Sequence, residues 1–156
     1  MKLIQIKILI FLITFSSSVW AENTDKPYLG SIKIADLFNK YPLFKEGYDN
    51  YVSSKLSTLK DDDISVVIFF GTWCHDSKRE LPKALKILSN IDIKDENIEL
   101  IGVGLDKKEP MGRAEKLNLM FTPTIIFFKN SKEVGRIIEK PVRSLEEDIE
   151  AIITSI

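Results

Sequence analysis

The segment Phe69-Phe70-Gly71-Thr72-Trp73-Cys74-His75-Asp76-Ser77 holds the chain's single cysteine. The unbroken β-branched and aromatic run over residues 65–70 predicts a central strand that is covered on both faces. After the cysteine, apolar residues recur at spacings of three and four, which predicts a helix to about residue 89: Leu81, Ala84, Leu85 and Leu88. Cys74 is therefore expected where a buried strand passes into the first turn of a helix.

This position favours a reactive thiol. The first turn of a helix has free N–H groups and a partial positive charge, and both stabilise a thiolate. Such placement lowers the pKa of a cysteine below its free value of about 8.5. His75, the only histidine, would act in the same direction when protonated, and Ser77 could donate a hydrogen bond to the sulfur. Asp76 opposes ionisation. Free cysteines are more often buried and inert, so the expectation rests on the position of Cys74.

The remaining patterns predict an alternating α/β chain. In order they are an amphipathic helix over 43–60, a strand over 98–104, a short helix whose first turn contains Pro110, strands over 124–129 and 133–139, and a last helix opened by the capping box of Ser144 and Glu147. Residues 31–34 fit either an edge strand or the start of a helix. An order that closes with a hairpin and a helix predicts a mixed central sheet with helices on both faces.

The segment around Cys74 resembles the active site of the thioredoxin superfamily, in which Trp-Cys-x-x-Cys follows a central strand. Pro82 stands where the family's active-site helix carries a proline, and Thr122-Pro123 matches the family's cis-proline. Residues 132–136 resemble the family's hairpin, in which a glycine allows close packing. The resemblance runs from about Val66 to the C-terminus and implies a thioredoxin fold. It also implies that Cys74 is the nucleophile.

The resemblance further implies a substrate groove beside the sulfur. Pro123 would shape it, the exposed backbone of Thr122 would pair with an extended substrate, and Trp73 would supply apolar contact. Two departures from the family pattern are visible: Ser77 replaces the second cysteine, and Ile68 stands where the family often has a buried acid.

The missing second cysteine restricts the chemistry. Thiol–disulfide exchange proceeds through a mixed disulfide, and no second thiol of this chain can resolve it. The sequence therefore predicts monothiol chemistry at Cys74. The resolving thiol would come from a client protein or from a small thiol such as glutathione.

Residues 1–21 predict a secretory signal peptide. A basic start, a short apolar run and a small-residue exit follow one another there: Lys2 and Lys7, residues 8–15, and Val19 with Ala21. A membrane anchor is the alternative, but the apolar run is shorter than the roughly 20 residues of a membrane span. We expect a single thioredoxin-like domain, residues 22–156, that is periplasmic or secreted and has no stable membrane anchor after cleavage.

Composition argues against several other functions. The 156 residues are 44% hydrophobic and 29% charged with a formal net charge of −1, as in one ordinary globular domain. The basic excess of a nucleic-acid binder is absent. Gly102 and Gly104 lack the third glycine of a nucleotide fingerprint. One cysteine beside one histidine makes a poor metal site, so no metal and no cofactor is expected.

Three hypotheses remain. The preferred one is an exported thiol–disulfide oxidoreductase or isomerase that acts through Cys74. The alternative is a redox-inactive binding module that keeps the peptide groove. The third is a covalent homodimer through Cys74, which a monomeric band on a non-reducing gel would exclude; a monomer is expected. The motifs do not specify the substrate, the electron donor or the direction of exchange.

Overall fold

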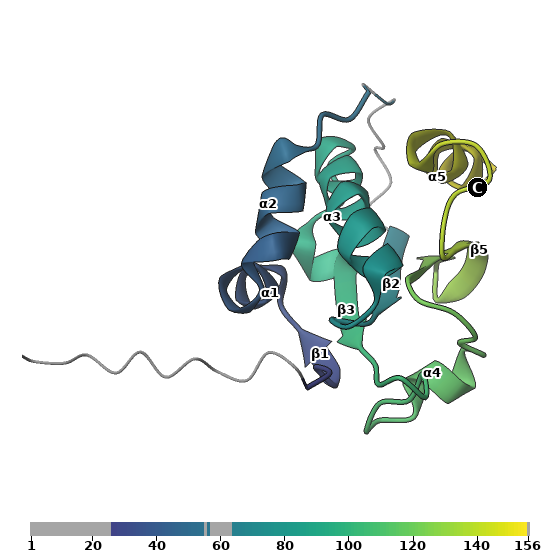
Figure 1. Ribbon diagram of the computed structural model, residues 1–156. Helices are drawn as coiled ribbons and strands as arrows, with labels where there is room; N and C mark the ends of the chain where they lie inside the picture. The colour runs from purple at the N-terminus through teal and green to yellow at the C-terminus, as the bar shows by residue number, and fades with distance from the viewer. Residues whose placement is uncertain (1–25, 55, 57–63, 156) are drawn as a thin grey trace, which may run out of the picture.

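The computed structural model describes residues 26–54, 56 and 64–155, and the predicted signal peptide over 1–21 lies outside them. The elements are β1 (Gly30–Ile32), α1 (Ile34–Lys40), α2 (Pro42–Asn50), β2 (Ile64–Phe70), α3 (His75–Asn90), the 3-10 turn η1 (Asp95–Asn97), β3 (Ile98–Gly102), α4 (Arg113–Lys116), β4 (Thr124–Lys129), β5 (Lys132–Ile138) and α5 (Leu145–Thr154). Figure 1 shows the helices arranged around the strands. No helix among these described residues is both long and apolar enough to cross a membrane.

The strands form one mixed sheet in the order β1-β3-β2-β4-β5. β2 is parallel to β3 and antiparallel to β4. β2 alternates between two cores: Val66, Ile68 and Phe70 face one, and Val67 and Phe69 face the other. Because both of its faces are buried, β2 has no polar alternation, and the predicted two-faced central strand is confirmed.

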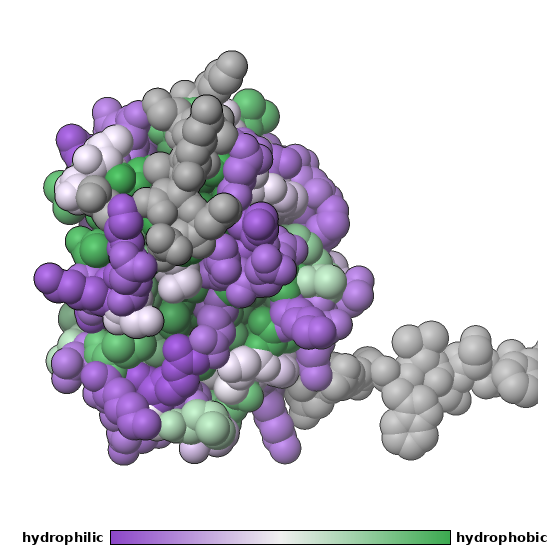
Figure 2. All heavy atoms as spheres, turned by 180° about the vertical axis from the view of Figure 1, so that it is seen from behind, coloured by the Kyte–Doolittle hydropathy of each residue, from purple (hydrophilic) through white to green (hydrophobic). Residues whose placement is uncertain are grey.

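Helices cover both faces of the sheet, as predicted, but they cover them unequally. The larger core packs α1, α2, α3 and α5 on one face through side chains such as Leu37, Phe44, Leu85 and Ile149. The smaller core contains Ala114 of α4 and Leu119. Figure 2 views the molecule from behind, where apolar atoms show between charged ones. The fold is thus an α/β sandwich with one thickly and one thinly covered face.

The C-terminal part agrees with the sequence patterns. β4 and β5 form the predicted antiparallel hairpin, with a register shift at Phe127 and Phe128. A Cβ at Gly135 would lie 2.9 Å from Ile152 of α5, so the hairpin glycine does permit close packing. The capping box at Ser144 is present: its hydroxyl accepts from the amide of Glu147, whose carboxylate accepts from the amide of Ser144.

The helix predicted over 43–60 is wrong beyond Asn50. Tyr51 has extended backbone angles and ends α2. Its hydroxyl lies 2.5 Å from a carboxylate oxygen of Glu146 in α5, so a tertiary hydrogen bond takes this aromatic residue out of the helical pattern. Residues 52–54 have no regular structure, and 57–63 lie outside the described residues.

Three smaller expectations are corrected. β3 ends at Gly102 rather than at residue 104. Pro110 precedes α4 instead of lying in its first turn, because Gly112, with a φ of +67°, leads into the helix at Arg113. The buried Glu109 carboxylate accepts from the amides of Met111, Arg113 and Ala114 there. Residues 31–34, expected to be either an edge strand or the start of a helix, contain both the end of β1 and the start of α1.

Candidate functional site

The turn between β2 and α3 is closed by two hydrogen bonds. The amide of Cys74 donates to the Gly71 carbonyl over 3.0 Å. The amide of Gly71 donates to the buried Ser77 hydroxyl oxygen over 3.1 Å. Cys74 is the residue that leads into α3, with extended backbone angles. The predicted strand–cysteine–helix arrangement is therefore confirmed, and Ser77 holds the turn to the helix.

Cys74 lies at the edge of the core. The residue retains 9% of its surface exposed and belongs to neither of the two core clusters. Its sulfur lies 3.1 Å from the Thr122 carbonyl, to which the thiol donates. The peptide bond between Thr122 and Pro123 is cis, as the resemblance implied. The fold thus brings the thiol against the residue that precedes the cis-proline. Thr122 is only 3% exposed, so the expectation that its backbone is exposed is wrong, because packing at the end of the sheet covers it.

The surroundings of Cys74 lower the pKa of its thiol. Burial alone would raise it, but hydrogen bonds that favour the thiolate outweigh burial. These come from the side chain of Thr122, from the amide and hydroxyl of Ser77, and from the amide of Asp76. Thr122 contacts the sulfur in two opposed ways, because its carbonyl accepts only from the protonated thiol. The net effect is a sulfur that ionises more readily than a free cysteine.

Trp73 lies against the backbone of the same turn. Its indole Nε1 donates to the Val103 carbonyl over 3.0 Å. A Cβ at Gly71 would approach the indole to 2.6 Å, so only glycine allows this contact. Lys107 places its ammonium 4.3 Å from the indole ring centroid, a distance typical of a cation–π interaction. Trp73 remains partly exposed beside the cysteine.

His75 is not drawn into the site. Its side chain is 88% exposed, and its Nδ1 lies 4.0 Å from a carboxylate oxygen of Asp76. Among the described residues, no hydrogen bond or ion pair joins the His75 ring to the Cys74 sulfur. The structure thus brings Cys74, Ser77 and Thr122 together, places Trp73 and Pro123 next to them, and leaves His75 pointing into solvent.

The two departures from the family pattern are both buried. Ser77 is fully buried where the family has its second cysteine. Ile68, in place of the acid, is fully buried in the larger core. Pro82 lies inside α3, and its ring contacts α2, since a Cβ at Gly47 would lie 3.0 Å from it. Ile68 packs against apolar side chains at this position, so no carboxylate from β2 assists proton transfer there.

Sequence analysis missed a row of charged residues on α3. Arg79 contacts Asp76 and Glu80, and Lys83 contacts Glu80. The spacing of three residues in the pairs Asp76–Arg79 and Glu80–Lys83 was a usable signal, because residues three apart lie side by side on a helix. The contact of Lys107 with Trp73 was also missed, since a loop between β3 and α4 makes it.

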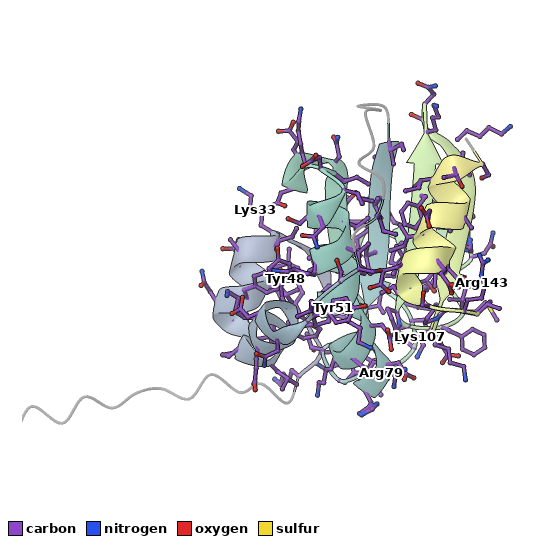
Figure 3. All side chains as sticks on the ribbon, turned by 90° about the horizontal axis from the view of Figure 1, so that it is seen from above. Lys33, Tyr48, Tyr51, Arg79, Lys107 and Arg143 are labelled. Carbon is purple, nitrogen blue, oxygen red and sulfur yellow. The ribbon has the colours of Figure 1, made fainter. Side chains whose placement is uncertain are left out.

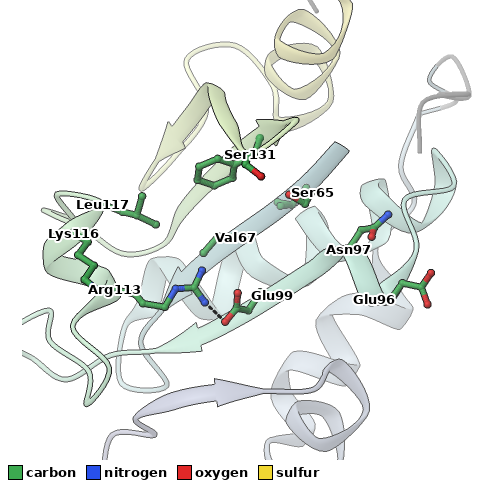
Figure 4. A pocket seen from close by; sticks show the side chains of 11 residues that line it. Ser65, Val67, Glu96, Asn97, Glu99, Arg113, Lys116, Leu117 and Ser131 are labelled. Carbon is green, nitrogen blue, oxygen red and sulfur yellow. Dashed lines mark hydrogen bonds and ion pairs between the residues drawn. The ribbon is translucent and has the colours of Figure 1, made fainter. Parts of the chain in front are cut away.

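A hollow on the thinly covered face is separate from Cys74. It lies between β2, β3, β4 and α4, over Val67, Leu117 and Phe128. An ion pair between Arg113 and Glu99 crosses it (Figure 4). It contains no nucleophilic thiol, so the cysteine turn remains the candidate site. No group of three or more metal-ligating side chains occurs among residues 26–54, 56 and 64–155.

Comparison with known proteins gives a consistent result. Residues 42–154 match the family model described as Thioredoxin, while β1 and α1 precede the matched residues. The chain is 35% identical over 95 residues to thioredoxin of Echinococcus granulosus, which covers 61% of this chain and 83% of that relative. It is 32% identical over 88 residues to thioredoxin Asp f 28 of Aspergillus fumigatus, with coverages of 56% and 76%. The X-ray structure of Fasciola hepatica thioredoxin shows 24% identity, a TM-score of 0.44, and coverages of 78% and 91%.

Proposed function

The chain belongs to the thioredoxin family, and we propose that it is an exported thiol–disulfide oxidoreductase or isomerase that works through the single nucleophile Cys74. Thiol–disulfide oxidoreduction is the role that its thioredoxin relatives support. The monothiol mechanism and the exported location are the proposal. The contact that carries it is the 3.1 Å approach of the Cys74 sulfur to Thr122, next to the cis-proline.

The reaction has two exchange steps. The Cys74 thiolate attacks one sulfur of a substrate disulfide, a new S–S bond forms, and the old one breaks. The departing thiolate takes up a proton. A second thiol, supplied by the client protein or by a small thiol such as glutathione, then attacks the mixed disulfide in its thiolate form and releases Cys74. With the client's own thiol the result is isomerisation, and with external thiols the substrate disulfide is reduced by two electrons.

Ionisation of Cys74 also prepares the groove. In the thiol form the Thr122 carbonyl accepts the S–H proton. Thr122 is only 3% exposed, so loss of that proton, together with local opening around Thr122, would free the carbonyl to accept an N–H from an extended substrate segment, as in strand addition. Trp73, partly exposed beside the sulfur, adds apolar contact. We assign Thr122, Pro123 and Trp73 to substrate binding on this ground.

Ser77 and His75 contribute unequally to the ionisation of Cys74 in this proposal. Ser77 stabilises the thiolate through its hydroxyl and amide. His75, exposed at the start of α3, acts only through its charge when it is protonated. The asymmetry follows from burial, since an electrostatic effect of an exposed group is weakened by solvent.

The N-terminal pattern supports export to the periplasm or secretion. Exported domains that depend on disulfides for stability carry cysteines in pairs, and a lone thiol cannot close an internal bridge, so Cys74 is not a structural disulfide partner within this chain. The proposal includes a monomer, and a single non-reduced band at the monomer mass in exported material would agree with it.

The test is the pH dependence of Cys74 alkylation, followed by trapping of mixed disulfides in exported material. We expect an alkylation midpoint below that of a free cysteine, and protein adducts that a reductant removes. The variant Cys74→Ala is a clean blank, because the chain has no other cysteine. A midpoint equal to that of free cysteine, together with no adducts, would refute the proposal.

A redox-inactive binding module is the second candidate, and the replacement of the resolving cysteine by Ser77 favours it. In that case the groove beside Thr122 would bind clients without covalent capture. Client binding would then survive Cys74→Ala unchanged. The monothiol proposal requires capture to disappear in the same variant.

A further inference from the structure

Four charged residues form a continuous chain along α3, next to Cys74. A guanidinium nitrogen of Arg79 lies 2.7 Å from Oδ1 of Asp76, and its Nε lies 2.5 Å from Oε1 of Glu80. The Lys83 ammonium lies 3.5 Å from Oε2 of Glu80. The charges alternate in sign along the helix, so they neutralise one another. Figure 3 labels Arg79, which joins Asp76 to Glu80 in this chain.

Asp76 has two opposed effects on the site. Its amide donates towards the Cys74 sulfur and favours the thiolate. An acid in the first turn also stabilises the helix. Its carboxylate, however, is a negative charge in the first turn of α3, two residues after Cys74, and a like charge disfavours ionisation. A free carboxylate at position 76 would therefore work against the thiolate that its own amide supports.

Arg79 is placed to neutralise the Asp76 carboxylate. The guanidinium is planar and holds several donors in a rigid fork, so it can bind two carboxylates at once. One of them, Glu80, has a side chain only 8% exposed and is therefore a fixed anchor. The other, Asp76, is 37% exposed and would otherwise be free to move. The buried anchor thus directs the guanidinium towards the exposed acid.

We propose that Arg79 is a positioning residue for Cys74, which pairs with the Asp76 carboxylate and so prevents it from opposing the thiolate. The inference rests on the thiol chemistry proposed above. It adds a residue that does not touch the sulfur and acts through Asp76 alone. Arg79 is correspondingly expected to affect the reactivity of Cys74 more than the fold.

Other charged groups approach this region from several elements. They are His75 beside Asp76, Lys107 over the Trp73 ring, and Glu46 and Lys78 in the hollow between α2 and α3. The segment before β4 contributes the uncharged Thr122. Within the described part of the chain, Arg79 is the cation whose ion pair with Asp76 is at hydrogen-bond distance. The effect of the Asp76 carboxylate on the thiolate should therefore depend on Arg79 more than on these other charged groups.

The experiment measures the alkylation midpoint of Cys74 in four variants of the purified protein. Arg79→Gln should raise the midpoint by about half a pH unit, or about threefold in rate at a fixed pH below it, after allowance for solvent screening. The double variant Arg79→Gln/Asp76→Asn should return the midpoint to the wild-type value. Lys86→Gln makes the same charge change on α3, where Lys86 contacts the Tyr48 ring instead, and should leave the midpoint unchanged.

Two results would overturn the inference: an unchanged midpoint in Arg79→Gln, or a double variant shifted as far as the single one. A purely structural role for Arg79 predicts the second result. The single variant Asp76→Asn is an independent check if Arg79→Gln does not fold. It should move the midpoint by less than Arg79→Gln does, and a larger downward shift would contradict the inference. A wild-type midpoint equal to that of free cysteine would instead refute the proposed function itself.

Discussion

The Ser77 hydroxyl oxygen accepts a hydrogen bond from the Gly71 amide over 3.1 Å. The residue that stands in for the family's second cysteine therefore fastens the end of β2 to the first turn of α3. Its hydroxyl also stabilises the Cys74 thiolate. A single buried side chain thus serves both the architecture and the chemistry of the turn.

Replacement of Ser77 by alanine should weaken both functions. The buried Gly71 amide would lose its acceptor, which costs about 1–3 kcal/mol of unfolding free energy. The pKa of Cys74 should rise, because a hydrogen bond that favours the thiolate is lost. Denaturant unfolding and the alkylation midpoint measure the two effects. Ser89→Ala, at the exposed end of α3, is the matched control and should change neither.

The variant Ser77→Cys should restore a dithiol pair. Residues three apart lie on the same side of a helix, and both Ser77 and Cys74 are already connected through the hydrogen bonds of the turn. Mild oxidation should remove both free thiols and reduce the mass by two hydrogens. Two thiols that stay titratable after oxidation would show that the turn holds the side chains too far apart.

Replacement of His75 by alanine should change reactivity little. The side chain is 88% exposed, so solvent weakens its influence on the sulfur. We expect a shift of the alkylation midpoint smaller than that of Ser77→Ala. A shift as large as that of Ser77→Ala would instead assign His75 a direct role.

The substitution Gly71→Ala should displace Trp73. The new Cβ would lie 2.6 Å from the indole, which is held by its hydrogen bond to Val103. Overpacking of this kind costs about 1–3 kcal/mol. Trp73 is the only tryptophan in residues 22–156, so its fluorescence reports the shift in a protein produced without residues 1–21. Gly104→Ala is the control, because its new Cβ would come within 3.0 Å only of the side-chain end of Asp106 and would meet Leu29 at an ordinary contact distance of 3.6 Å.

Replacement of Tyr51 by phenylalanine should loosen the contact between the end of α2 and α5. The lost hydrogen bond to the Glu146 carboxylate is worth about 1.5–3 kcal/mol. Tyr48→Phe is the control, because Tyr48 contacts Phe38 and Lys86 through its ring. Equal losses of unfolding free energy in the two variants would contradict the assignment.

The same tyrosine predicts a pH dependence. Burial first, and then Glu146, raise the pKa of Tyr51 above its ordinary value of 10.0. A raised pKa in the folded state means that its contribution is complete below about pH 10 and is lost as the pH rises above that value. Unfolding free energy measured between pH 8 and pH 11 should therefore fall more steeply in the wild type than in Tyr51→Phe.

Much of the fold could be predicted because its signals are local. The apolar run of β2 indicates burial on both faces, and the Ser144 capping box indicates the start of α5. The prediction failed where a distant partner overrode a local pattern. Tyr51 continues a helical apolar spacing, yet its bond to Glu146 ends α2. α4 likewise begins where Glu109 binds three amides, a contact that helical periodicity does not reveal.

The sequence alone determined that one cysteine would follow a buried strand and open a helix. Strand burial and helical periodicity can be predicted from the types and spacing of neighbouring residues. Only the tertiary structure decided what that sulfur meets. Thr122 lies 48 residues away along the chain, and the sheet brings its carbonyl to 3.1 Å from Cys74. Local patterns specify backbone conformation, whereas the ionisation of a thiol depends on every dipole and charge that packing brings to it.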